Sequence, residues 1–194
     1  MVEYRIRKDN VKLMYRKLRI ADFNFDEEYN KAMDNDDEVR MKRIIEKAAK
    51  SKGFNVKVYH NTDSRFTVFD TDSESTARPT HTWNAEYEDG TVFLSNKPNK
   101  AYGSIQMNLV IPKSEIKMFQ APDGMGAAQA MDDIFATEVI YYGIVGVKDE
   151  YGNIIYATLD NQIIKSLDTV TVSDDGDIIM PSERFDIRKS DIRY

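Results

Sequence analysis

The stretch Val58-Tyr59-His60-Asn61-Thr62 lies where the sequence changes from a helical pattern to a β-type pattern. Gly53 closes the helical part, and Val56 and Val58 then alternate with Lys57, which is the period of two expected of a strand. The stretch therefore predicts the end of a short strand, followed by a turn. His60, one of only two histidines in the chain, would stand at that end and could face a cleft.

Two helical patterns precede this strand. The apolar positions of the first and of the second each recur at helical spacing: Tyr29, Ala32 and Met33, then Met41, Ile44, Ile45 and Ala48. The residues between them, 34–37, are rich in helix-capping types, so they are expected to end one helix and begin the next. Residues 1–25 show no clear period and are expected to form a lead-in segment. Residues 26–194 are expected to form one domain.

The rest of the chain alternates β-type runs with turn signals. Strands are expected at residues 56–58, 66–70, 91–94, 105–111, 115–119, 141–148 and 153–159, and a helix at 124–137. Asp149-Glu150-Tyr151-Gly152 is a hairpin signal, Asp174-Asp175-Gly176 is a turn signal, and residues 71–90 form a long polar loop. The sum predicts an α+β fold with N-terminal helices and a mostly antiparallel, split sheet.

Composition narrows the possible functions. The net charge of −6 argues against a general binder of phosphate backbones, although residues 1–19 are locally basic, as a solvated segment or a nucleic-acid arm would be. The absence of cysteine excludes disulfides, thiolate nucleophiles and cysteine zinc sites. Two histidines without metal-binding spacing predict no metal site. No apolar run approaches about 20 residues and no signal pattern opens the chain, so a cytoplasmic location is expected.

Four segments in order carry a resemblance to a known family. Ala48 to Phe54 is similar to a helix end of the form Ala-Ala-Lys-x-x-Gly-aromatic, and Val58 to Thr62 is similar to a Tyr-His-Gly-Thr strand. Thr91 to Asn96, with Ala101-Tyr102-Gly103 behind it, is similar to a Gly-Phe-Tyr-Phe-Thr-Asp strand and the helix after it. The fourth segment joins Ile164 to Asp168 with Ser182-Glu183-Arg184-Phe185 and Asp191 to Tyr194.

The family is the ADP-ribosyltransferase-like domain of phage and mobile-element polyvalent proteins, within the diphtheria-toxin and poly(ADP-ribose) polymerase group. The resemblance covers roughly residues 29–194. It implies an ADP-ribosyltransferase-like split sheet with NAD, as substrate, bound in a cleft between the two halves. It also implies transfer of ADP-ribose to a protein or nucleic-acid acceptor, in the cytoplasm of a host cell if a phage encodes the chain.

The resemblance assigns roles to particular residues. His60 would hydrogen-bond the adenosine-side ribose, and the backbone of Asn61 would bind the carboxamide of NAD. Phe93 and Tyr102 would enclose the nicotinamide ring, with Thr62 and Ser95 as polar supports. His60 and Gln162 are the candidate catalytic residues.

Three departures from the family pattern leave a second hypothesis open. Asn61 replaces a glycine, Ile155 falls where the catalytic glutamate is expected, and Gln162 is one residue out of register. The alternative is a catalytically inactive ADP-ribosyltransferase fold that acts as an NAD-binding or protein-interaction module. His60 could equally be a structural histidine and Phe93 a core residue. Arg184, in the tail, is expected to be an ion-pair or hydrogen-bond anchor of the fold.

Overall fold

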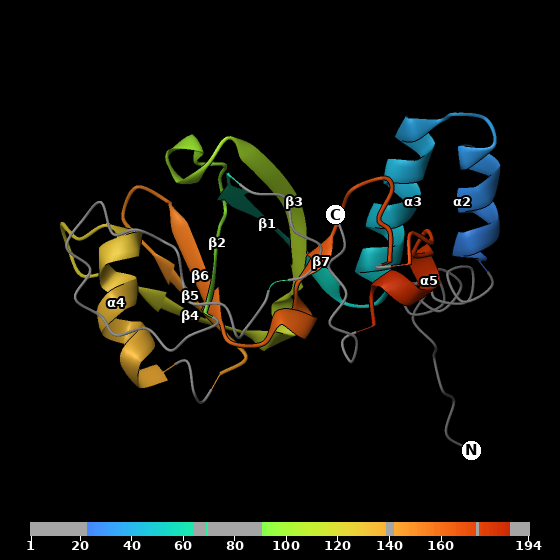
Figure 1. The fold of residues 1–194 in the computed structure, drawn as a ribbon. Coiled ribbons are helices and arrows are strands. Elements are labelled where there is room, and N and C mark those ends of the chain that lie inside the picture. Colours follow the sequence, from blue (N-terminus) through green and yellow to red (C-terminus); the bar gives the residue numbers. More distant parts are fainter. Residues whose placement is uncertain (1–22, 64–68, 70–90, 139–141, 174, 187–194) are drawn as a thin grey trace, which may run out of the picture.

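The computed structural model describes residues 23–63, 69, 91–138, 142–173 and 175–186. Their central feature is a seven-stranded sheet with the strand order β4-β5-β6-β2-β1-β3-β7. All neighbours are antiparallel except β4 and β5. Helices α2, α3 and α5 gather at one end of the sheet and α4 lies at the other (Figure 1). The expected α+β class, with N-terminal helices and a mostly antiparallel sheet, is confirmed.

The two N-terminal helices, α2 (Phe25–Met33) and α3 (Glu38–Ser51), form where the pattern predicted them. Side chains cap both helices: Asn24 accepts from the backbone of Glu27, and Asp37 accepts from the backbone of Arg40. Their predicted apolar positions, from Tyr29 to Ala48, are buried, apart from Met33, which packs at the margin of that cluster. Gly53 follows α3 with φ +89°, the left-handed conformation that glycine tolerates best.

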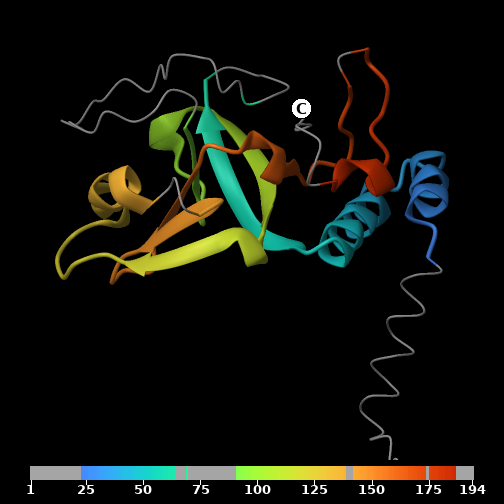
Figure 2. The same cartoon turned by 90° about the horizontal axis from the view of Figure 1, so that it is seen from below.

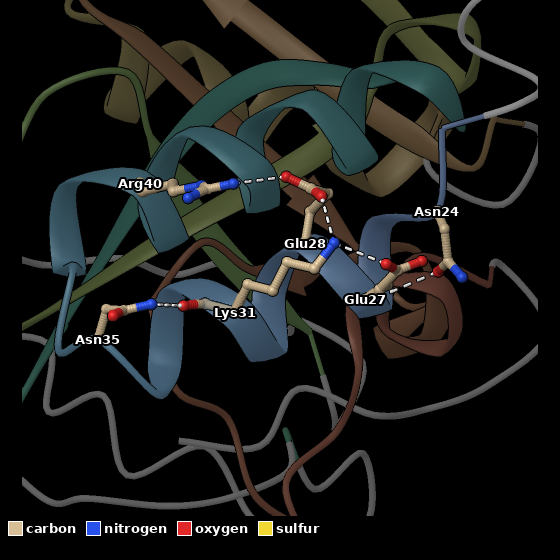
Figure 3. A network of polar contacts seen from close by, with 6 residues as sticks. All are labelled: Asn24, Glu27, Glu28, Lys31, Asn35 and Arg40. Atoms are coloured by element: carbon tan, nitrogen blue, oxygen red, sulfur yellow. Dashed lines mark hydrogen bonds and ion pairs between the residues drawn. The ribbon is translucent and has the colours of Figure 1, made fainter.

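Of the exposed ion pairs drawn in Figure 3, that of Arg40 with Glu28 crosses between these two helices, and those of Lys31 lie within α2. The Arg40 guanidinium lies 2.6 Å from Glu28, and the Lys31 ammonium lies 2.6 Å from Glu27 and 3.2 Å from Glu28. Hydrogen bonds from Arg40 and then Lys31 hold the pKa of Glu28 below its usual value. Such exposed pairs stabilise a fold weakly, so the buried cluster is the main attachment of α2 to α3.

Strand β1 (Phe54–Thr62) has two very different neighbours. It pairs with β3 (Ile105–Pro112) from Phe54 to Thr62, with one irregularity between Phe54 and Val56. With β2 (Val92–Ser95) it shares a single pair, Tyr59 with Ser95. We call this β1–β2 boundary the junction. On the far side of β3, the two-residue strand β7 (Lys165–Ser166) completes one half of the sheet.

The other half contains β2 and three further strands. These are β6 (Ile154–Thr158), β5 (Ile144–Lys148) and β4 (Ile116–Gln120). The predicted hairpin at 149–152 joins β5 to β6, and Gly152 there has φ +77°. Helix α4 (Ala127–Glu138) packs on β5 and β6 and begins three residues later than expected (Figure 2). The strand expected at 66–70 and the loop at 71–90 lie outside the described residues, except for Phe69.

Short 3-10 helices connect the strands. They are η1 (Lys100–Tyr102), η2 (Lys113–Glu115) and η3 (Asn161–Ile163). The last helix, α5 (Pro181–Arg184), begins at a proline, which suits a first helical position. In the predicted turn at 174–176, residue 174 lies outside the described residues, and Gly176 has φ +86° and donates to the Ser173 carbonyl, as a turn requires.

Arg184 closes the helical end of the fold. Its side chain is 1% exposed and donates to the carbonyls of Asp168 (2.6 Å) and Ile179 (3.2 Å). Burial lowers the pKa of Arg184 to about 10, against the opposing effect of Tyr29. The hydroxyl of Tyr29 in α2 donates to the Thr169 carbonyl at 2.6 Å. The predicted role of Arg184 as an anchor is thus confirmed, with backbone carbonyls as its partners.

Within the described residues, none of the helices has the length and apolar character needed to span a membrane.

Candidate functional site

The junction is where the described candidate residues meet. The ladder between β1 and β2 stops after Tyr59 and Ser95, and the next contact is made by a side chain. The Nδ1 atom of His60 lies 2.9 Å from the Phe93 carbonyl oxygen. A carbonyl only accepts, so Nδ1 carries the proton, and in the neutral ring Nε2 carries the lone pair. His60 therefore joins the two halves of the sheet through its imidazole.

The ring of His60 lies on the face of the sheet that carries the apolar cluster of Val58, Leu94 and Leu109. It meets the ring of Phe69 edge to face, with centroids 5.0 Å apart at 89°. Phe69 is 6% exposed and belongs to that cluster. Burial lowers the pKa of His60, although the bond to the Phe93 carbonyl opposes this effect. His60 is accordingly neutral at pH 7, which fixes Nε2 as a hydrogen-bond acceptor.

Sequence reasoning missed the residue that holds Phe69. The Asn161 side chain in η3 donates to the Phe69 carbonyl at 2.7 Å, across 92 positions of sequence. Gln162, the predicted second catalytic residue, is next to Asn161 and is exposed. Its backbone N–H donates to the Asp160 carboxylate at 2.9 Å. Gln162 thus lies on the same 3-10 turn as Asn161, whose side chain holds the backbone of Phe69 beside His60.

The side chains of Phe93 and Ser95 point to the opposite face. Successive residues of a strand alternate between faces, and Phe93 packs against the cluster beneath α4, whereas Val92 and Leu94 belong to the cluster near His60. The Ser95 hydroxyl donates to the Lys97 carbonyl. The structure therefore brings His60 and Phe93 together through a backbone carbonyl, while their rings lie on different faces of the sheet.

Ile155 shares that second face. It pairs directly with Ser95 in β2 and with Val147 in β5, and it is half-buried at the margin of the cluster beneath α4. The row continues across the sheet through Tyr59 to Asn108. None of these five residues carries a carboxylate. The side chain at the position expected for the catalytic glutamate thus neither donates nor accepts, and it packs at the margin of an apolar cluster.

The end of β1 holds η1. The side chain of Asn61 is 9% exposed; it accepts from the Asn99 backbone at 2.9 Å and donates to the Gly103 carbonyl at 3.4 Å. Thr62 is half-buried, and its backbone lies against Gly103. Tyr102 ends η1, so its backbone lies close to the end of β1; its side chain is outside the described part of the structure.

Other features suit structural roles. Among the residues that the structure describes, no three potential ligands gather in a way that could hold a metal ion. Asp149 accepts from Asn153, Ala127 and Tyr151, and these bonds outweigh burial and keep the pKa of Asp149 below its usual value. Two adjoining hollows of about 310 and 340 Å³ lie at the other end of the molecule, where Lys52 and Ser182 line both.

Comparisons of the chain with family models, with curated proteins and with solved structures found no match. The resemblance to ADP-ribosyltransferase-like domains therefore rests on the residues quoted from the sequence, and the roles assigned through it remain predictions.

Proposed function

We propose that this domain binds NAD at the junction and acts as a binding module with the ADP-ribosyltransferase type of site, without transferring ADP-ribose. One observation carries the proposal. Residues that the resemblance assigns to NAD binding come from β1, β2 and η1. These elements meet where β1 shares one pair with β2 and where the side chains of His60 and Asn61 bond to the backbones of Phe93 and Asn99. A boundary of this kind can accept a ligand without breaking a ladder of backbone hydrogen bonds.

His60 is suited to a ribose hydroxyl. With Nδ1 donating to the Phe93 carbonyl, Nε2 is the acceptor nitrogen of the neutral ring, which is the type of group that pairs with a sugar hydroxyl. The fixed bond also restricts the orientation of the ring, so less conformational entropy is lost on binding. This supports a positioning role for His60 toward the sugar part of the ligand, which needs no proton transfer.

Transfer itself needs a group that the described site lacks. Breaking the bond between ribose and nicotinamide develops positive charge on the sugar, as glycoside cleavage does, and a carboxylate stabilises that charge. Ile155 cannot do so, and its row of paired neighbours offers only hydroxyl and amide groups as polar side chains. The geometry therefore supports binding better than transfer.

The transferase hypothesis remains as the second candidate because of Gln162. Its exposed side chain follows Asn161, whose amide holds the Phe69 backbone beside His60. An amide there could orient an acceptor by hydrogen bonding, although it could not neutralise a positive sugar. ADP-ribose would then pass to a protein or nucleic-acid acceptor, with nicotinamide leaving.

Thermal unfolding with and without NAD tests the first candidate. A ligand present at 100 times its Kd adds about 2.7 kcal/mol to the free energy of unfolding. We expect stabilisation of the unmodified protein by NAD and its loss in His60→Ala. Asn24→Ala is the matched control: it removes the cap of α2, costs about 1 kcal/mol and should keep the NAD effect. No shift at millimolar NAD in the unmodified protein would reject NAD binding.

Labelled NAD with mixed protein and nucleic-acid acceptors tests the second candidate. We expect no covalent label with the unmodified protein. Labelling that disappears in both His60→Ala and Gln162→Ala would replace the binding module by the transferase. Labelling that survives both substitutions would contradict the catalytic roles assigned to these two residues.

A further inference from the structure

Asn61 has a use for its side chain that the glycine of the resembled family could not have. Its carboxamide bridges two backbone groups on either side of η1: Oδ1 accepts from Asn99 at 2.9 Å, and Nδ2 donates to Gly103 at 3.4 Å. These partners lie 38 and 42 positions further along the chain. The side chain thereby ties both ends of the 3-10 turn to the end of β1. We call this pair of bonds the Asn61 clamp.

Neighbouring contacts also hold η1 against the end of β1. The Asn99 side chain accepts from the Ala101 backbone at 3.1 Å, which caps η1. Gly103 has φ +145°, and a Cβ added to it would lie 2.2 Å from the Thr62 carbonyl carbon. The Asp63 carboxylate accepts from the Ser104 backbone at 3.0 Å. Residues 61–63 thus each contact the turn, and of these contacts only the Asn61 clamp spans it.

We propose that Asn61 is a positioning residue that sets the place of η1, and with it Tyr102, for the nicotinamide half of NAD. The ligand named here rests on the proposed function. A buried side chain that satisfies a donor and an acceptor on one turn restricts that turn without touching the ligand. The position therefore tolerates a side chain because the side chain is turned toward η1.

Asn96 provides a matched control elsewhere in the sheet. Its Oδ1 accepts from the Ile154 backbone at 2.9 Å, and its Nδ2 donates to the Gly152 carbonyl at 3.0 Å. The chemistry is the same as in the Asn61 clamp, but the segment held is the β5–β6 turn. Replacing either asparagine by alanine removes one acceptor and one donor, so the two variants should lose similar stability.

Amide hydrogen exchange measured by NMR tests the clamp without any ligand. In Asn61→Ala, the Asn99 amide should exchange about tenfold faster, since one hydrogen bond of ordinary strength is lost, while the Ile154 amide is unchanged. Asn96→Ala should give the reverse pattern. Equal exchange of the Asn99 amide in Asn61→Ala and the unmodified protein would overturn the clamp.

Titrations with NAD, nicotinamide and ADP-ribose test the positioning role. Asn61→Ala should weaken NAD and nicotinamide about tenfold and leave ADP-ribose within about twofold, whereas Asn96→Ala should change none of them. Asn61→Asp, which keeps the acceptor for Asn99, should lose less NAD affinity than Asn61→Ala. NAD binding by Asn61→Gly that equals or exceeds the unmodified protein would overturn the proposal, as would equal losses for NAD and ADP-ribose.

NAD binding by the protein and the positioning role of Asn61 can be rejected separately. If the unmodified protein binds neither NAD nor nicotinamide, the proposed function and the positioning role both fail, while amide exchange still decides whether Asn61 holds the turn. If NAD binds and Asn61→Ala loosens the turn without changing affinity, NAD binding stands and the positioning role is rejected.

Discussion

The two sides of β1 are built differently. Toward β3 the strand pairs from Phe54 to Thr62 through its backbone, whereas toward β2 it shares one pair and the bond from His60 to the Phe93 carbonyl. The Asn61 clamp ties the end of the strand to η1. Backbone ladders depend little on which side chains are present, but side-chain bonds disappear with a single substitution. The β3 side thus gives the molecule a rigid half, and the β2 side leaves a boundary whose geometry particular residues determine.

The largest effect on stability is expected at Arg184, the buried anchor of the helical end of the fold. Arg184→Ala leaves the carbonyls of Asp168 and Ile179 buried without their donor, so we expect a loss of about 3–5 kcal/mol in the free energy of unfolding. Urea unfolding followed by circular dichroism measures it. Arg43→Ala, an exposed change on α3, should stay within about 0.5 kcal/mol. A loss below about 1 kcal/mol for Arg184→Ala would contradict the anchor.

Gly103→Ala changes the packing of η1 against the end of β1. The added methyl would overlap the Thr62 backbone, and the left-handed φ of +145° adds strain, so we expect a loss of about 2–4 kcal/mol. Gly176→Ala is the control, since it has φ +86° but open space around it, and it should lose only about 1 kcal/mol. Equal losses in the two variants, measured by urea unfolding, would show that η1 is not closely packed on β1.

The sequence predicts the elements that have local signals and misses those that depend on distant partners. Helices α2 and α3 and the β5–β6 hairpin were predicted because caps, apolar spacing and turn residues act over a few positions. The two-residue strand β7 and the parallel pairing of β4 with β5 depend on distant partners and have no local signal. The sequence indicated His60 as a candidate residue, but it did not predict that the ladder between β1 and β2 stops beside it.

The candidate site shows the limit most clearly at Asn61. The sequence indicates a polar residue where a glycine was expected, and it assigns the backbone of Asn61 to the ligand. Its side-chain role becomes visible only once η1 has folded back onto β1 from 38 positions away. In the same way, Asn161 supports Phe69 across 92 positions, a distance at which spacing rules say nothing.

A smaller effect on stability is expected in α4, which packs on β5 and β6 in the half of the sheet that contains β2. Asp132 has one carboxylate oxygen that is shielded and has no hydrogen-bond partner among the described residues. Burial, and then the charge of Asp133, raise the pKa of Asp132 from 3.8 to about 6. The unfolded chain therefore releases this proton first as the pH rises, and stability is lost between about pH 3.8 and 6.

Asp132→Asn removes that cost. At pH 7 we expect it to stabilise the protein by about 1 kcal/mol, a value reduced for solvent screening of a partly exposed group, and the gain should vanish near pH 4. Asp123→Asn, an exposed change before α4, should stay within about 0.5 kcal/mol of the unmodified protein at pH 7. Thermal unfolding at pH 4 and pH 7 measures both, and a variant that is less stable than the unmodified protein at pH 7 would contradict the assignment.

The smallest effect expected is at His60, and it bears most directly on the difference between the two sides of β1. Since the pKa of His60 is lowered on folding, the unfolded chain binds the proton more readily, and stability falls as the pH drops below about 6.5. His60→Gln, which cannot titrate but whose amide can still donate, should lack this part of the acid sensitivity. If low pH loosens only the junction, the amides of β1 that bond to β3 should keep their protection from exchange at pH 5.5, while Ser95, the β2 residue that pairs with β1, becomes less protected. Uniform loss of amide protection along both sides of β1 would mean that the junction is no weaker than the ladder with β3. The side-chain bonds at the junction would then add to backbone pairing instead of substituting for it.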